Sequence, residues 1–118
     1  MDKESELIAT AMRRSPRIIA VDLDGTLASQ EKGWRGYAYI GKPIMSVIKD
    51  LRKEKRKGAK TILHTCRVTT LDNRVNEESL ATIRAWLHKY KVPIDEIWMG
   101  TGKPYAAEYW DDKAVKKP

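Results

Sequence analysis

The sequence predicts a single α/β domain in which helices flank a parallel β-sheet in three layers. Short apolar runs rich in β-branched residues alternate with longer segments whose apolar residues recur at helical spacing. Such alternation favours parallel strands joined by right-handed crossovers. A length of 118 residues leaves room for one domain, which we expect to span residues 1–118 without a linker or an internal repeat.

The first predicted elements are a short helix and a buried strand. Residues 1–15 carry apolar side chains among charges at helical spacing, and Pro16 ends this amphipathic helix. Ile18–Val21 is apolar, rich in β-branched residues and too short for a helix, as expected of a central strand with both faces buried. The polar, glycine-containing stretch Asp22–Thr26 follows it.

A segment rich in glycine and aromatic residues, 28–42, separates this strand from the next helix, and we expect it to form a hairpin or flap. Pro43 is well placed as the first residue of that helix. Gly58 is expected to mark its end. Thr61–His64 then forms the second strand, which closes at Thr65.

The second half of the chain repeats the alternation. A second amphipathic helix is expected to end near Tyr90 and Pro93, with apolar side chains at Leu80, Ile83, Ala85, Trp86 and Leu87. The third predicted strand is Glu96–Met99. The fourth is Ala107–Trp110, which leads into the acidic pair Asp111-Asp112.

Polar residues stand where these strands end. Asp22 and Asp24 follow the first strand, Thr65 the second and Asp111 the fourth, while Lys103 lies in the loop before the fourth strand. Ligands of open α/β sheets bind outside the carboxyl ends of the strands, so we expect these side chains to meet there. Converging carboxylates repel one another unless a cation lies between them. Oxygen ligands with room for water suit Mg²⁺.

These residues carry a family resemblance. Asp22-Leu23-Asp24-Gly25-Thr26 after an apolar strand resembles the first motif of the haloacid dehalogenase superfamily. Thr65 is similar to the second motif, Lys103 to the third and Asp111-Asp112 to the fourth. All four occur in order and together span nearly the whole chain. The resemblance implies a Rossmann-like fold and phosphoryl-transfer chemistry.

The resemblance also implies a role for each residue. Asp22 would attack phosphorus and form an aspartyl-phosphate. Asp24 would protonate the leaving oxygen and then activate water; an acid at this position is typical of the phosphatases of the superfamily. Thr65 would bind phosphoryl oxygens, and Lys103 would neutralise nucleophile and phosphate together. Mg²⁺ would contact Asp22, the backbone carbonyl of Asp24, and Asp111, with Asp112 supporting the site without binding the metal.

The spacing leaves no room for a cap domain, so the resemblance is to a small capless member. Only sixteen residues lie between Thr26 and Pro43, enough for a flap. We therefore expect an open site. Arg67, two residues after Thr65, is a further candidate contact to the substrate phosphate. An open site excludes water poorly. We expect a large substrate that covers the site itself, or a neighbouring subunit of a homo-oligomer that does so.

Each candidate also has a purely structural interpretation. Asp24-Gly25-Thr26 is compatible with an ordinary turn, and Thr65 with a cap on the next segment. Asp111-Asp112 suits a helix N-cap, and a loop lysine such as Lys103 is often only solvated. His64 is expected to pack near the site without acting as a base or a ligand. The lone Cys66 is not expected to act as a nucleophile.

The charge of the chain, formally +7, is concentrated in one stretch. Lys49–Lys60 holds seven basic and two acidic residues. This pattern suits a solvated helix end whose cations complement the helix dipole. It also suits a surface that attracts anionic substrates or nucleic acid, a partner suggested further by the aromatic side chain of Trp34. The chain has no apolar run of membrane-spanning length and no signal-peptide core, and we expect a cytoplasmic protein with no membrane partner.

The sequence therefore favours a magnesium-dependent phosphatase acting on a phosphomonoester, with a nucleotide or a nucleic-acid end among the candidate substrates. Two alternatives remain open. The first is a catalytically idle fold of the same type that serves as a basic binding module. The second is a phosphotransferase, which would use the same residues to pass phosphate to another acceptor.

Overall fold

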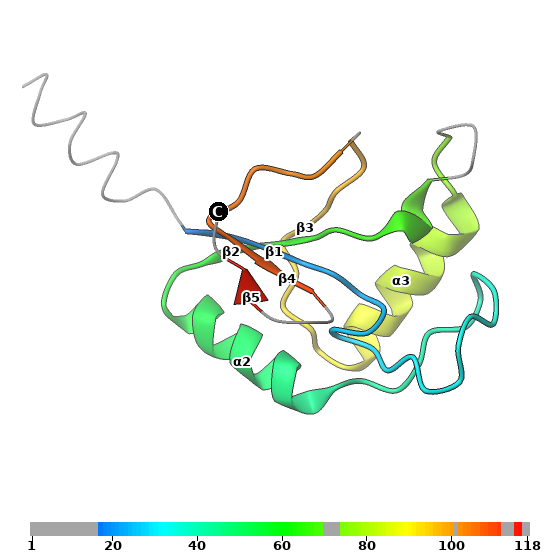
Figure 1. The fold of residues 1–118 in the computed structure, drawn as a ribbon, viewed down its shortest axis with the longest axis horizontal. Helices are drawn as coiled ribbons and strands as arrows, with labels where there is room; N and C mark the ends of the chain where they lie inside the picture. The colour runs from blue at the N-terminus through cyan, green and yellow to red at the C-terminus, as the bar shows by residue number, and fades with distance from the viewer. Residues whose placement is uncertain (1–16, 70–73, 101, 112–114, 117–118) are drawn as a thin grey trace, which may run out of the picture.

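A computed structural model describes residues 17–69, 74–100 and 102–111, together with the backbone of 115–116. The helix expected over residues 1–15 and the residue Asp112 lie outside these described residues. Four parallel strands form the body of an α/β fold (Figure 1). The elements, in chain order, are β1 (Ile18–Val21), α2 (Met45–Arg56), β2 (Lys60–Leu63), the 3₁₀ turn η1 (Cys66–Val68), α3 (Glu77–Lys89), β3 (Glu96–Ile97), β4 (Glu108–Trp110) and β5 (Val115–Lys116).

The sheet has the strand order β3-β2-β1-β4-β5. β1 lies at its centre and pairs in parallel with β2 and β4, and the short β5 pairs antiparallel with β4. Ile19 and Val21 in β1 and Leu63 in β2 are completely buried, and burial on both faces explains why β1 contains only apolar residues. The alternation of strands and helices that the sequence predicts is therefore present.

Both described helices cover the same face of the sheet. Ile48 from α2 and Ile83 from α3 pack in one core with Ile19, Val21 and Leu63. The connections from β1 to β2 and from β2 to β3 step in the same direction along the sheet, so right-handed crossovers place both helices on one side. The connection from β3 to β4 returns in the opposite direction and passes over the other side, where Figure 1 shows a loop.

This arrangement differs from the three layers expected from the sequence. A helix in the β3–β4 connection would supply the third layer, but its described residues are in loop conformation. Within the described part of the chain, the helices and the sheet form two layers.

Helix α2 begins later than the sequence suggests, at Met45 and not at Pro43. Ile44 stays extended because its N–H donates to the carbonyl of Leu27, at 2.8 Å, in the turn after β1. Pro43 is held in a bridge with Ala28. A contact with a turn distant in the sequence thus delays the first helical turn. The helix ends at Arg56, and Gly58 follows with a positive φ of 94°.

Helix α3 (Glu77–Lys89) lies where the sequence predicts the second amphipathic helix. Asn76 caps its first turn by accepting a hydrogen bond from the N–H of Ser79 at 3.0 Å. Near its other end, the indole N–H of Trp86 donates to the carbonyl of Gly41 at 3.1 Å. This bond ties the helix to the base of segment 28–42, which we call the flap.

The flap is an irregular loop whose two ends lie against each other. The N–H of Ser29 donates to the carbonyl of Lys42 at 2.7 Å. Gly41 approaches Ser29 so closely that a Cβ added there would lie 1.9 Å from the Ser29 carbonyl oxygen. Only glycine fits this crossing point.

The two outer parallel strands are shorter than predicted. β3 ends at Ile97, although the N–H of Trp98 still donates to the carbonyl of Leu63 at 2.8 Å. β4 begins at Glu108, one residue later than expected. Among the residues that the structure describes, no helix has the length and apolar character needed to cross a membrane.

Candidate active site

Three adjacent strands end level with one another. Val21 is paired with Leu63 on one side and with Trp110 on the other. The N–H of His64 donates to Val21 at 2.8 Å, and the N–H of Asp22 donates to Trp110 at 2.9 Å, so the pairing continues one residue further. His64, Asp22 and Asp111 therefore stand side by side at one edge of the sheet, as the strand-end argument predicts.

A hollow of about 370 Å³ opens at this edge, and we call it the first hollow. It is lined by two predicted site residues of the strand ends, Asp22 and Asp111, and by Lys103 from the loop before β4. His64 and Cys66 also line it. The carboxylate of Asp22 accepts a hydrogen bond from the N–H of Leu23 at 2.8 Å. The predicted nucleophile, one predicted metal ligand and the predicted lysine thus border one space.

The turn after β1 is tight and anchored in the core. The carbonyl of Leu23 accepts hydrogen bonds from Leu27 at 3.0 Å and from Ala28 at 2.9 Å, and both leucines are fully buried. Gly25 has a positive φ of 83°, a conformation that costs glycine little. Asp24 therefore lies in a hydrogen-bonded turn that follows β1.

Asp24 forms a two-pronged ion pair with Arg67. The Nε and Nη2 atoms of Arg67 donate to the two carboxylate oxygens of Asp24 at 2.7 and 2.8 Å. Arg67 is only 3% exposed. The indole of Trp34 in the flap lies over the guanidinium, 4.8 Å from ring centroid to Cζ. Arg67, a candidate phosphate contact by sequence, binds Asp24 in the structure, and neither residue lines the first hollow.

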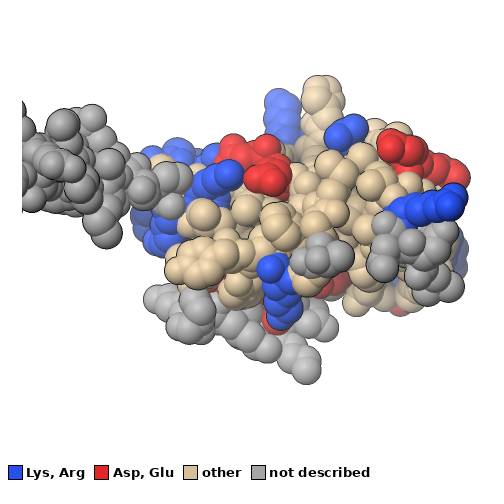
Figure 2. Space-filling view, turned by 90° about the horizontal axis from the view of Figure 1, so that it is seen from above, with Lys and Arg blue, Asp and Glu red and all other residues tan. Residues whose placement is uncertain are grey.

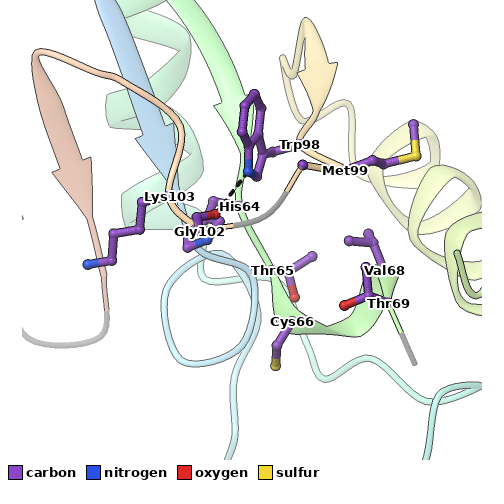
Figure 3. A pocket seen from close by; sticks show the side chains of 10 residues that line it. His64, Thr65, Cys66, Val68, Thr69, Trp98, Met99, Gly102 and Lys103 are labelled. Atoms are coloured by element: carbon purple, nitrogen blue, oxygen red, sulfur yellow. Dashed lines mark hydrogen bonds between the residues drawn. The ribbon is translucent and has the colours of Figure 1, made fainter. Parts of the chain in front are cut away.

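Thr65 has the capping role that its place before a new segment allows. Its hydroxyl accepts a hydrogen bond from the N–H of Arg67 at 3.3 Å and so caps the 3₁₀ turn η1. Its side chain is also directed into a second hollow, which adjoins the first (Figure 3). Thr65 and Lys103 therefore border the second hollow together, whereas Asp22 borders the first hollow and not the second.

His64 lies close to the site, as the sequence predicts, and it stands where the two hollows meet, which the sequence does not predict. His64 lines both. Burial and the positive charge of Lys103 lower the pKa of its imidazole below the usual value. The sequence feature that could have indicated this position is that His64 precedes Thr65 at the end of the second predicted strand. Trp98 and Met99, which line the second hollow, gave no comparable signal.

The donor atoms can be compared with the needs of a magnesium ion. No group of three or more acidic, histidine or cysteine side chains in the described ranges is placed to hold a metal together. The magnesium site that the resemblance implies needs fewer side chains, because its protein ligands are two carboxylates and a backbone carbonyl. Asp22 and Asp111 border the same hollow and offer only oxygen, the donor that Mg²⁺ prefers, so this part of the set fits.

The basic stretch Lys49–Lys60 is engaged in part within the fold. Lys55 pairs with Asp95 and Lys60 with Glu96, and Arg52 donates to the carbonyl of Tyr90 at 2.9 Å. Figure 2, which views the molecule from the side away from α2, shows both acidic and basic side chains on that face. Lys55, Lys60 and Arg52 therefore have partners within the fold.

Neither a scan against protein-family models nor a search of curated proteins finds a match. Among solved structures, the chain is similar to the crystal structure of a target protein from Vibrio cholerae. The two chains are 32% identical over 85% of the present chain and 83% of the other, with a TM-score of 0.58. The chain thus belongs to the same family as this Vibrio cholerae protein.

Proposed function

We propose that the protein is a magnesium-dependent phosphomonoester hydrolase in which Asp22 is the nucleophile. The observation that supports this most is the shared border of the first hollow, where Asp22, Asp111 and Lys103 meet at the carboxyl ends of β1 and β4. Ligands of parallel α/β sheets bind at such an edge. Two acids and a lysine around one space suit a phosphate group together with a cation.

The proposed reaction has two steps. A carboxylate oxygen of Asp22 attacks phosphorus, the bond from phosphorus to the leaving oxygen breaks, and Asp24 supplies a proton to that oxygen. Water then attacks phosphorus in the aspartyl-phosphate and releases inorganic phosphate, while Asp24 takes up a proton from the water. Lys103 neutralises negative charge in both steps, and Thr65 orients the phosphoryl group. Asp22 is regenerated, so atoms and charge balance over the cycle.

Asp22, Asp111 and the backbone carbonyl of Asp24 would hold Mg²⁺. When bound, the ion contributes positive charge that draws phosphate toward Asp22 and stabilises the charge that develops during transfer.

The ion pair between Arg67 and Asp24 sets a condition on this chemistry. A carboxylate that accepts two hydrogen bonds from a guanidinium has no proton to give, so proton transfer requires the pair to open. Trp34 and the carbonyl of Gly36, 3.5 Å from Nη1, link Arg67 to the flap. We therefore propose that the flap shifts when substrate binds and that Arg67 is a positioning residue for Asp24.

The same ion pair favours a second candidate function. In the structure Asp24 borders neither hollow, which is what a catalytically idle binding module of this fold would show. The two candidates differ in one measurable respect, because an idle module would bind phosphorylated compounds without turning them over.

Phosphate release by the full chain in the presence of Mg²⁺, on a panel of phosphorylated metabolites and phosphorylated oligonucleotides, tests the proposal. Asp22→Asn should reduce turnover at least about a thousandfold without loss of fold, because the nucleophile is gone. Asp50→Asn, an exposed site on α2, removes the same charge and serves as the matched control. Asp22→Asn activity within about tenfold of the wild type would reveal a contaminating enzyme or a different mechanism.

A further inference from the structure

The second hollow extends the candidate site in one direction. It also measures about 370 Å³ and shares His64, Cys66 and Lys103 with the first hollow. The β2 end, η1 and the loop after β3 form its walls (Figure 3). A molecule whose phosphate lies beside Asp22 can therefore reach the second hollow by passing these shared side chains.

The chemistry of the second hollow differs from that of the first. None of the described residues that line it is acidic. Trp98, Met99 and Val68 supply apolar surface, and Thr65 and Thr69 add hydroxyl groups. Met99 is 45% exposed, so this apolar surface is accessible from solvent. Such a lining suits an uncharged organic group with a few polar atoms.

The indole of Trp98 is fixed in place by two glycines. Its Nε1 donates to the carbonyl of Gly102 at 3.0 Å. A Cβ added at Gly100 would lie 2.6 Å from the Cζ2 atom of the indole, so the ring occupies the space that a side chain there would need. Because its only polar hydrogen is already satisfied, the ring offers a ligand its apolar π surface. A fixed aromatic surface loses little conformational entropy on binding.

We propose that the second hollow binds the planar aromatic ring of a phosphomonoester whose phosphate lies in the first hollow. This inference rests on the proposed function. Because His64, Cys66 and Lys103 stand where the two hollows meet, the ring and the phosphate must be separated by a spacer. A nucleoside monophosphate has this chemistry, with a hydroxylated spacer that suits the hydroxyl group of Thr69. A simple aryl phosphate lacks the spacer.

Turnover of matched substrates tests this assignment. The full chain with Mg²⁺ should hydrolyse adenosine monophosphate with a kcat/KM about tenfold or more above that of glycerol 3-phosphate or p-nitrophenyl phosphate. Trp98→Leu should abolish this preference, measured as the ratio of the kcat/KM values of adenosine monophosphate and glycerol 3-phosphate in the same protein. Tyr105→Leu, at an aromatic side chain that is 87% exposed and lines neither hollow, should retain it. An equal preference in wild type and Trp98→Leu would overturn the assignment.

Gly100→Ala supplies a second variant that keeps the indole. The added Cβ must displace the ring, so the preference for adenosine monophosphate should fall as it does in Trp98→Leu. A Gly100→Ala protein that retains the wild-type circular dichroism spectrum and the full preference would count against a fixed indole as the binding surface.

A binding measurement separates this inference from the proposed reaction. Cys66 is the only cysteine of the chain, is exposed and lines both hollows, so its alkylation by iodoacetamide reports on their occupancy. Adenosine, which carries no phosphate, should slow alkylation of the wild type and not of Trp98→Leu. Inorganic phosphate should slow alkylation of both.

The outcomes distinguish the two proposals. Protection by adenosine that depends on Trp98, without turnover of any phosphate ester, would support the ring site and contradict the phosphatase. Turnover without protection by adenosine, and without a preference for adenosine monophosphate, would support the phosphatase and overturn the ring site.

Discussion

Arg67 donates two hydrogen bonds of 2.7 and 2.8 Å to the carboxylate of Asp24, although the two residues are 43 positions apart in the sequence. The pair joins the turn after β1 to the 3₁₀ turn after β2, and Trp34 of the flap covers the guanidinium. The residue proposed as acid and base is therefore held by the fold itself, at a point where the flap also contacts it.

Removing one partner of this pair should be costly. Arg67→Met leaves the Asp24 carboxylate, whose side chain is 18% exposed, without its guanidinium. We expect a loss of about 3–5 kcal/mol in the free energy of unfolding, measured by urea denaturation. In the double variant with Asp24→Asn the loss should be smaller than the sum of the single losses, since no buried charge is left alone.

Arg84→Met provides the control for this experiment, because Arg84 is exposed on α3. It should change the free energy of unfolding by no more than about 0.5 kcal/mol. An Arg67→Met protein as stable as Arg84→Met would show that the ion pair contributes nothing to the fold.

His64 should titrate below its usual pKa in the metal-free protein. Burial and the charge of Lys103 both disfavour the imidazolium. Lys103→Met should therefore raise the pKa of His64, measured from its imidazole resonances by NMR, with the resonances of His88 on α3 as an internal reference. An unchanged His64 titration in Lys103→Met would remove Lys103 as a cause of the lowered pKa.

The same shift predicts how stability varies with pH. The unfolded chain takes up a proton on His64 near pH 6.5, before the folded chain does. The contribution of His64 is therefore complete above about pH 6.5 and is lost as the pH falls through the lower pKa of the folded state. His64→Gln should flatten the decline in the free energy of unfolding over this acidic range, and a decline as steep as in the wild type would contradict it.

The basic stretch Lys49–Lys60 should act as a solvated helix face. Lys49, Lys53 and Arg56 are exposed members of this stretch on α2. Replacing all three with glutamine keeps good helix formers and removes three charges. We expect the KM for a phosphorylated oligonucleotide, and its dependence on salt, to remain as in the wild type. A reduced salt dependence would instead identify this face as part of an anion-binding surface.

The elements that the sequence predicts correctly depend on local patterns. Ile18–Val21 is apolar because both faces of a central strand are buried, and the same run places Asp22 at the strand end. Because the carboxyl ends of parallel strands meet at one edge, the position of Asp111 beside Asp22 follows from topology. Neither conclusion requires knowledge of side-chain contacts.

The remaining features depend on contacts between distant segments. Helix α2 starts at Met45 because Ile44 binds Leu27, and the local sequence around Pro43 gives no sign of it. The partner of Arg67 lies 43 residues away, and the sequence suggests a phosphate contact just as well. Among the described residues, the β3–β4 connection crosses the other side of the sheet as a loop, and no periodic pattern in the sequence marks the difference from a helical crossover.

The most direct test of the account is the site of phosphorylation during turnover. Wild-type protein mixed with substrate and Mg²⁺ is quenched in acid, digested, and mapped by peptide mass spectrometry, with Asp24→Asn included because it should slow hydrolysis of the phosphoenzyme. The account predicts a phosphoryl group on Asp22 that hydroxylamine removes, as expected of an acyl phosphate. Turnover with no phosphoryl group on Asp22 in either protein, or with the group on another residue, would contradict it.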